Sequence, residues 1–160
     1  MRPTPVPSAF EVRELFEGLL GRAVEWTADS HRVDPINGAT VGTYIDDVGQ
    51  VRAVVALDVP LTAWAGSAIA LLPHNGAEST VKSGLVTSAQ FDNVSEILNV
   101  AASMFNQQGC SHLRLETVYA PRETLPPEVA QYVLAPAGRL DGVLAIQGYN
   151  GGSVSVVVAF

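Results

Sequence analysis

The chain has 160 residues, 48% of them hydrophobic, and a formal net charge of −7. This composition excludes a largely disordered chain, and the acidic balance argues against nucleic acid or an anionic membrane surface as partner. The single cysteine, Cys110, excludes an internal disulfide and a multi-cysteine zinc site. No signal segment is visible, and the longest mostly apolar run, residues 59–73, is too short to span a bilayer. We therefore expect a cytoplasmic protein without membrane insertion.

The first part of the sequence predicts a tail, a helix, a short strand and a hairpin. Three prolines make the first residues an extended tail, and the remaining residues, 9–160, are expected to form one domain. Ser8 and Glu11 have the spacing of a capping box at the start of a helix. The expected elements are a tail at 1–8, a helix at 9–20, a strand at 24–27, a turn at 34–38 and hairpin strands at 41–46 and 51–58.

The middle of the sequence predicts two helices separated by a loop. Pro60 and Pro73 bracket an apolar segment that is expected to be helical. Residues 74–89 are polar and contain glycine, which favours a surface loop. Residues 92–107 have the 3.6-residue periodicity of an amphipathic helix, and Gly109 is placed to end it.

The last part predicts a strand, a short helix and a second hairpin. An Asn-Gly pair between two apolar runs is a strong signal for the hairpin turn. The expected elements are a strand at 113–119, a helix from Pro126-Pro127 through Leu134, and hairpin strands at 140–148 and 153–160 joined by a turn at 149–152.

The order of helix, strand and hairpin therefore occurs twice, at 9–58 and at 92–160. The residues themselves do not repeat, so the duplication is one of topology. Two such halves can share one largely antiparallel sheet covered by helices, which is an α+β fold. The last strand ends at Phe160, and an exposed edge there would favour a homodimer through sheet pairing.

One face of the helix at 92–107 is a narrow polar stripe. It is formed, at offsets of 0, 4, 7, 11 and 14 residues, by Asp92, Glu96, Asn99, Ser103 and Asn106. The stripe has carboxylates and amides but no Lys or Arg, whereas a purely solvated face more often contains basic residues for i,i+4 pairs. The alternative explanation is an ordinary surface helix, which also needs a polar face.

The spacing of Asp92, Glu96 and Asn99 resembles the D/S-x3-E-x2-N motif of the CheC/CheX/FliY phosphatases of bacterial chemotaxis. As in that family, a strand follows the motif helix and a long hairpin closes the sequence, whereas the first half fits less specifically. The resemblance implies a CheC/CheX-like fold. It also implies a phosphatase that removes the aspartyl phosphate of a CheY-like response regulator in two-component signalling.

By this resemblance, Asn99 orients the attacking water and Glu96 pairs with the active-site Lys of the regulator. Asp92 is expected to support the helix start or contact the partner, and Ser103 lies where the partner would pack. No cofactor of the chain's own is implied, because the regulator supplies both the phosphoryl group and its bound Mg²⁺. Phosphoryl transfer depends mainly on in-line positioning and charge stabilisation, and a neutral amide orients water without adding negative charge.

The sequence departs from the family pattern at three places, one of which is Val100, where the family often has Met directly after the motif Asn. The helix at 9–20 lacks an E-x2-N motif, so the resemblance is to the single-site, CheX-like form. Ser103 stands four residues after the motif Asn, where the family often has Gly. A side chain at this position favours the alternative function, which is a non-catalytic domain of the same fold that binds a receiver or a flagellar-switch-like partner.

Other chemistry-bearing residues show no pattern of a site. His31, His74 and His112 are far apart and lack metal-ligand spacing. Asp46 and Asp47 lie at a predicted hairpin turn, where Asp is favoured for its own hydrogen bonds. We therefore expect no metal site in this chain.

Overall fold

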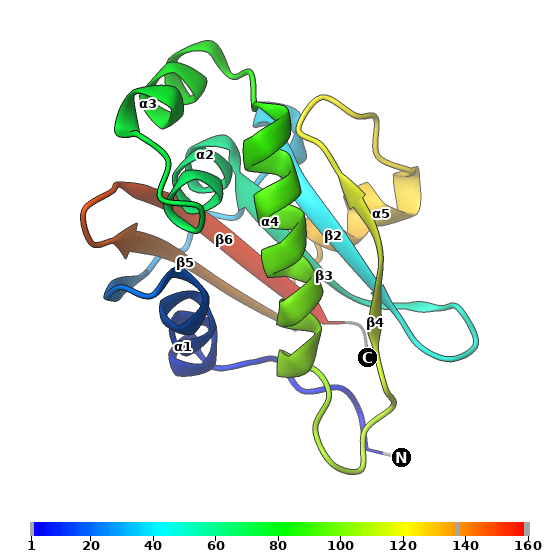
Figure 1. The fold of residues 1–160 in the computed structure, drawn as a ribbon. Helices are drawn as coiled ribbons and strands as arrows, with labels where there is room; N and C mark the ends of the chain where they lie inside the picture. Colours follow the sequence, from blue (N-terminus) through cyan, green and yellow to red (C-terminus); the bar gives the residue numbers. More distant parts are fainter. Residues whose placement is uncertain (1, 137, 159–160) are drawn as a thin grey trace.

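The computed structural model describes residues 2–136 and 138–158. In these residues, one six-stranded sheet is packed between α-helices (Figure 1). The helices are α1 (Ala9–Leu20), α2 (Val59–Ala68), α3 (His74–Ser83), α4 (Ser88–Ala101) and α5 (Pro127–Val133), with 3-10 turns η1 (Pro35–Asn37) and η2 (Ala102–Met104). The strands are β1 (Val24–Ala28), β2 (Ala39–Ile45), β3 (Val51–Asp58), β4 (Arg114–Tyr119), β5 (Arg139–Ile146) and β6 (Gly151–Val158).

The strand order confirms the predicted duplication. The order is β1-β5-β6-β3-β2-β4, and every neighbouring pair is antiparallel. Exchanging β1, β2 and β3 with β4, β5 and β6 gives the same order read in reverse. The first strand of each half thus pairs with the second strand of the other half, and the third strands, β3 and β6, meet at the centre. The fold is the α+β architecture expected from the sequence.

The prediction that the C-terminal strand is a sheet edge is wrong. β6 lies between β5 and β3, and the edges of the sheet are β1 and β4. Val154, Val156 and Val157 are buried, because this strand is covered on both faces. Phe160 lies outside the described residues.

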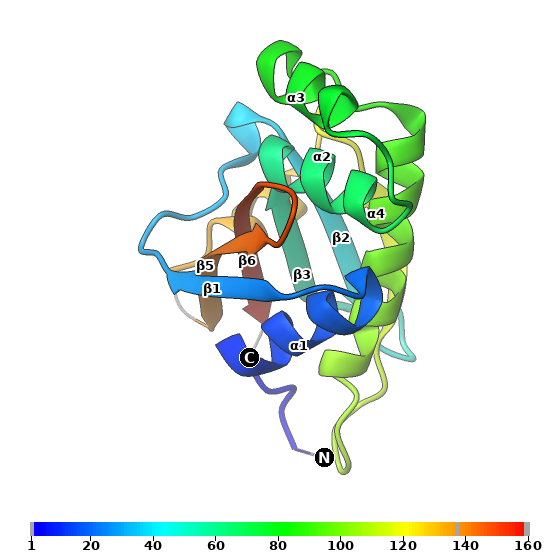
Figure 2. The same ribbon diagram turned by 60° about the vertical axis from the view of Figure 1, so that its left-hand side comes forward.

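The two faces of the sheet carry separate cores. The larger core lies under α1, α2 and α4, and Figure 2 shows these helices along one face, with α3 stacked beyond α2. The smaller core lies on the other face, under α5 and the segment between β1 and β2. β3 contributes alternate residues to each core, with Val55 and Leu57 on one face and Val54 and Ala56 on the other. This alternation is typical of a strand and agrees with the strand predicted at 51–58.

The segment at 74–89 is not a loop, because residues 74–83 form α3. Only Ala77 and Thr80 of this helix are buried, so its polar composition reflects a helix with one narrow inward face. Gly84 ends it in the left-handed conformation with a φ of +75°.

The second hairpin is confirmed, but its turn lies earlier than the Asn-Gly pair. Tyr149 N–H donates to the Ile146 carbonyl at 2.9 Å, and Gly148 has a φ of +78°. Gly151 and Gly152 belong to β6, where they pair with Ala145 and Leu144.

Residues 2–8 contain no helix, and Arg2 forms a parallel bridge to Cys110 beyond the end of α4. The Cys110 thiol lies 3.5 Å from the Pro3 carbonyl, to which it donates. Within the described residues, no helix combines the length and the hydropathy that crossing a membrane requires.

Candidate functional site

The motif helix, α4, begins earlier than the sequence periodicity indicates. Thr87 Oγ1 accepts from Gln90 N–H at 3.1 Å, and Gln90 Oε1 accepts from Thr87 N–H at 3.1 Å. This capping box starts the helix at Ser88 rather than at Asp92. The α-helix ends at Ala101 and passes into η2, so Gly109 does not terminate it and lies in a later turn.

The inner face of α4 is fixed closely against α2. A Cβ atom at Gly66 of α2 would lie 2.6 Å from the Gln90 carbonyl oxygen, so only glycine permits this approach. Asn93 Nδ2 donates to the Gly66 carbonyl at 2.8 Å. The apolar side of the predicted periodicity at 92–107 is buried, as Val94, Ile97, Leu98 and Ala101 on α4 and Phe105 after η2 show.

Gln90 also ties α3 to the first turn of α4. Its Oε1 accepts from Thr80 Oγ1 at 2.9 Å, and each of these two residues is 2% exposed. Sequence reasoning missed this contact, and it also missed the capping box, although the Thr-x-x-Gln spacing at 87–90 is visible in the sequence. The motif helix is therefore held by α2 and by α3 before its polar face begins.

The outer face of α4 carries the predicted stripe. Asp92, Glu96 and Asn99 are exposed on it, and Ser103 is exposed on η2, which continues from α4. Within the part of the chain that the structure describes, no hydrogen bond or ion pair engages any of these four side chains. In Figure 1, α4 crosses in front of the sheet with one side facing away from every other element. The structure thus brings these four residues together along one accessible line.

Asn106 is not part of this accessible stripe, which corrects the sequence prediction. Its side chain is partly buried and clamps the Leu113 backbone: Nδ2 donates to the carbonyl at 2.9 Å, and Oδ1 accepts from the N–H at 2.7 Å. Both functional groups of the amide are therefore used inside the fold. The chain leaves the helical pattern after Met104, so Asn106 no longer follows the periodicity of α4.

Two aspartates outside the stripe are engaged in a turn and in a helix cap. Asp46 accepts from Val48 N–H, Gln50 N–H and Arg52 Nε in the β2–β3 turn, and the hydrogen bond from Arg52 is the main cause of its lowered pKa. Asp58 caps α2 through Leu61 N–H at 2.8 Å, and burial raises its pKa. These carboxylates hold the fold together, as expected for Asp46 at a turn.

A pocket of about 250 Å³ extends the outer face of α4 at its N-terminal end. Phe91, which precedes Asp92, forms part of its wall together with the linker from α3 and the segment after β4. The lining residues are Gly84, Leu85, Val86, Thr87, Ser88, Phe91, Ala120, Pro121 and Arg122.

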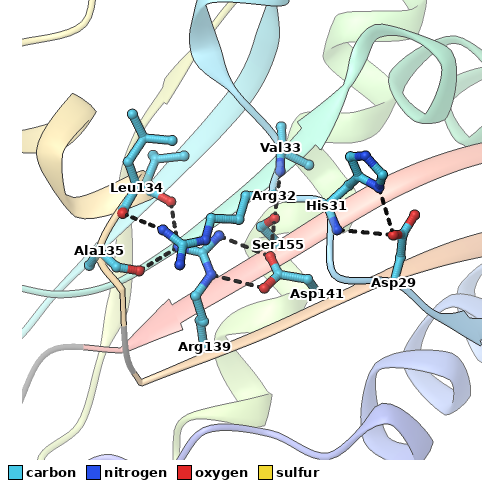
Figure 3. Close-up of polar contacts among 10 residues, drawn as sticks. Asp29, His31, Arg32, Val33, Leu134, Ala135, Arg139, Asp141 and Ser155 are labelled. Atoms are coloured by element: carbon cyan, nitrogen blue, oxygen red, sulfur yellow. Dashed lines mark hydrogen bonds and ion pairs between the residues drawn. The ribbon is translucent and has the colours of Figure 1, made fainter.

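A network of buried and partly buried polar groups lies on the face of the sheet opposite α4 (Figure 3). Arg139 binds Asp141 through two hydrogen bonds of 2.9 Å, and their side chains are only 7% and 12% exposed. Arg139 also donates to the carbonyls of Val133 and Ala135 at the end of α5, and Ser155 Oγ donates to Asp141 at 2.6 Å. Its groups bind one another, so this network is structural.

The histidines do not meet. His31 Nδ1 lies 3.0 Å from Asp29 Oδ1, and the His74 ring packs against the Tyr149 ring with centroids 4.6 Å apart. Among the described residues, no three His, Cys, Asp or Glu side chains are grouped in a way that could hold a metal ion.

Comparison with known proteins identifies the fold. No protein-family model matches the sequence, and no curated protein matches it. The chain is similar to the middle domain of FliM from Vibrio alginolyticus, with a TM-score of 0.58, 10% identity, and coverage of 92% of this chain and 86% of that one. FliM in the FliG–FliM complex of H. pylori is similar with a TM-score of 0.59 and 9% identity, over 92% of this chain and 84% of that one. FliY of Thermotoga maritima is similar with a TM-score of 0.54 and 15% identity, over 92% of this chain and 82% of that one. The chain therefore has the fold of FliM and FliY, in agreement with the CheC/CheX-type fold expected from the sequence.

Proposed function

We propose that the chain is a phosphatase for the aspartyl phosphate of a CheY-like response regulator, with Glu96 and Asn99 as its site. The observation that carries this proposal is the row of exposed side chains on α4, which no described group of the chain engages. Glu96 and Asn99 are three residues apart and therefore neighbours on one helix face. A flat partner surface can reach both at once.

The chemistry assigned to each residue follows from its functional group. The Asn99 amide can donate and accept hydrogen bonds, so it can orient a water molecule in line with the phosphorus atom. The Glu96 carboxylate would pair with the regulator's lysine and fix the docking geometry. The Mg²⁺ bound by the regulator would stabilise the charge on the phosphoryl oxygens, and no metal of this chain's own is required. Asp92 and Ser103 extend the contact on either side.

A second candidate function is a binding domain without hydrolysis. Ser103 is exposed at the position where the resembling family often has Gly, and a side chain there would hold the partner away from Asn99. Two FliM structures with this fold are complexes, one with FliG and one with SpeE. A flagellar-switch-like partner would use the same face of α4.

Decay of the phosphorylated receiver domains encoded by the same organism, in excess Mg²⁺, tests the proposal. We expect the chain to accelerate the decay of at least one receiver, and Asn99→Ala to remove the acceleration. Unchanged decay of every receiver, with binding still detectable, would favour the binding domain.

A homodimer through a sheet edge is also proposed, and it would use β1 or β4. Light scattering after size-exclusion chromatography should give twice the monomer mass. A monomer at all concentrations would remove this proposal.

A further inference from the structure

The helical hydrogen-bond pattern of α4 changes at the turn that carries Asn99. In a continuing α-helix, the Ala102 N–H would donate to the Leu98 carbonyl. It donates instead to the carbonyls of Asn99 and Val100, and η2 follows directly. The Leu98 carbonyl is thereby left without its helical donor, in a buried position where an unpaired oxygen is costly.

Tyr44 of β2 supplies the missing donor. Its hydroxyl donates to the Leu98 carbonyl at 2.5 Å, and the residue is 0% exposed. Burial raises the pKa of the phenol, so the hydroxyl keeps its proton at neutral pH. The Tyr44 ring also packs against Phe105, which follows η2, with ring centroids 5.0 Å apart. One side chain therefore contacts both ends of the tightened turn.

Gly42, two residues earlier on the same face of β2, lets the turn approach the strand. A Cβ atom there would lie 3.3 Å from Leu98 Cδ1 and 3.2 Å from Leu115 Cδ1, which is tighter than ordinary packing. A larger residue would push Leu98 outward and lengthen the hydrogen bond from Tyr44. Gly42 and Tyr44 together form the surface of β2 against which this turn of α4 packs.

We infer that Tyr44 is a positioning residue for Asn99. The Leu98 carbonyl and the Asn99 N–H belong to one planar peptide group, so fixing that oxygen fixes the plane from which Asn99 projects. Leu98 points into the core and Asn99 points to solvent. The buried phenol thus sets the direction of the exposed amide without touching the partner. This inference rests on the proposed function, because it concerns the same amide.

The kinetic test compares Tyr44→Phe with a control that loses a buried hydrogen bond elsewhere on β2. Thr40→Val is a matched control, since Thr40 and Thr62 are 0% exposed and share a hydrogen bond of 2.9 Å that does not involve α4. Tyr44→Phe should lower kcat about fivefold, the equivalent of one hydrogen bond, and leave KM within about twofold. Thr40→Val should change neither constant at a temperature where both variants are folded. Equal kcat values in the two variants would overturn the inference.

Nuclear magnetic resonance separates this inference from the proposed function. In Tyr44→Phe, the side-chain amide signals of Asn99 should shift and broaden and the Ala102 amide should exchange faster, whereas Thr40→Val should leave both unchanged. Unaltered Asn99 and Ala102 signals in Tyr44→Phe would overturn the positioning role. A wild-type protein that hydrolyses no phosphorylated receiver would overturn the proposed function, and the Asn99 signals would still decide the role of Tyr44.

Discussion

The two duplicated helices, α1 and α4, start alike and use their polar residues differently. Both begin with a capping box, from Ser8 and Glu11 in α1 and from Thr87 and Gln90 in α4. In α1, Arg13 pairs with Glu17 at 2.7 Å and with Glu14 at 3.2 Å. Glu17 also accepts from the Val24 N–H at 3.2 Å.

The outer face of α4 has no such partners. No Lys or Arg occurs between Ser88 and Met104, and the described residues leave Glu96 and Asn99 unengaged. A helix that is only a cover for the sheet can satisfy its charges locally, as α1 does. The difference supports the proposal that α4 presents its polar groups to a partner. Substitutions in internally paired groups should therefore cost stability, and substitutions in the stripe should cost activity.

The largest expected effect is on an internally paired group. Arg139→Met leaves Asp141 buried without its cation and two carbonyls without donors, so it should lower the free energy of unfolding by about 3 kcal/mol. Urea unfolding measures this loss. Receiver dephosphorylation by the folded variant should stay at the wild-type rate. A rate loss in the folded variant would contradict the distinction between groups that stabilise the fold and groups that act on the receiver.

Asn99→Asp should lower the rate and leave stability unchanged, which is the opposite of the result expected for Arg139→Met. The side chain keeps its shape but brings an anion toward the phosphoryl group, so the rate of receiver dephosphorylation should fall about a hundredfold. The urea midpoint should not change, because Asn99 is exposed. Glu14→Gln in α1 is the control and should leave the rate unchanged. Full activity in Asn99→Asp would show that Asn99 is not part of the catalytic site.

Glu96→Gln should weaken docking more than chemistry. Loss of one charge pair with the receiver should raise KM about tenfold and leave kcat nearly unchanged. The dependence of KM on ionic strength should also become shallower. A fall in kcat at unchanged KM would mean that Glu96 acts on the reacting groups instead.

Ser103→Gly should have the smallest effect. Removing this side chain lets the partner approach more closely and should improve receiver affinity about threefold, as measured by calorimetry. An unchanged affinity would show that Ser103 does not hinder docking, and it would weaken the argument for a non-catalytic domain.

Much of α4 could be predicted because periodicity reports which residues face a core. Its start was missed, because Thr87 lies in the polar segment 74–89 that composition assigns to a loop, although the Thr-x-x-Gln spacing at 87–90 is that of a capping box. Asn106 has the right spacing for the stripe but turns inward after the helix tightens. The contact between Tyr44 and Leu98 joins residues 54 positions apart, and no local pattern specifies such a pair.

The sheet shows the same limit. Hairpins are local, so 41–58 and 140–158 could be paired from turn chemistry. The central position of β6 depends on its pairing with β3, which brings together distant parts of the chain. β6 has four valines and no charged residue, whereas the edge strands β1 and β4 contain Glu25, Arg114 and Glu116. This difference in composition is the local signal of a covered strand, and it does not specify the partner of β6.

The most direct test is to map the receiver's contact on the isotopically labelled chain by nuclear magnetic resonance. The receiver would carry Mg²⁺ and beryllium fluoride as a stable mimic of the phosphoryl group. The account predicts that signals of Glu96, Asn99 and Ser103 shift with the activated receiver and that signals of Arg13 and Glu14 on α1 do not. Shifts centred on α1, or no shift on α4 with any receiver, would contradict it.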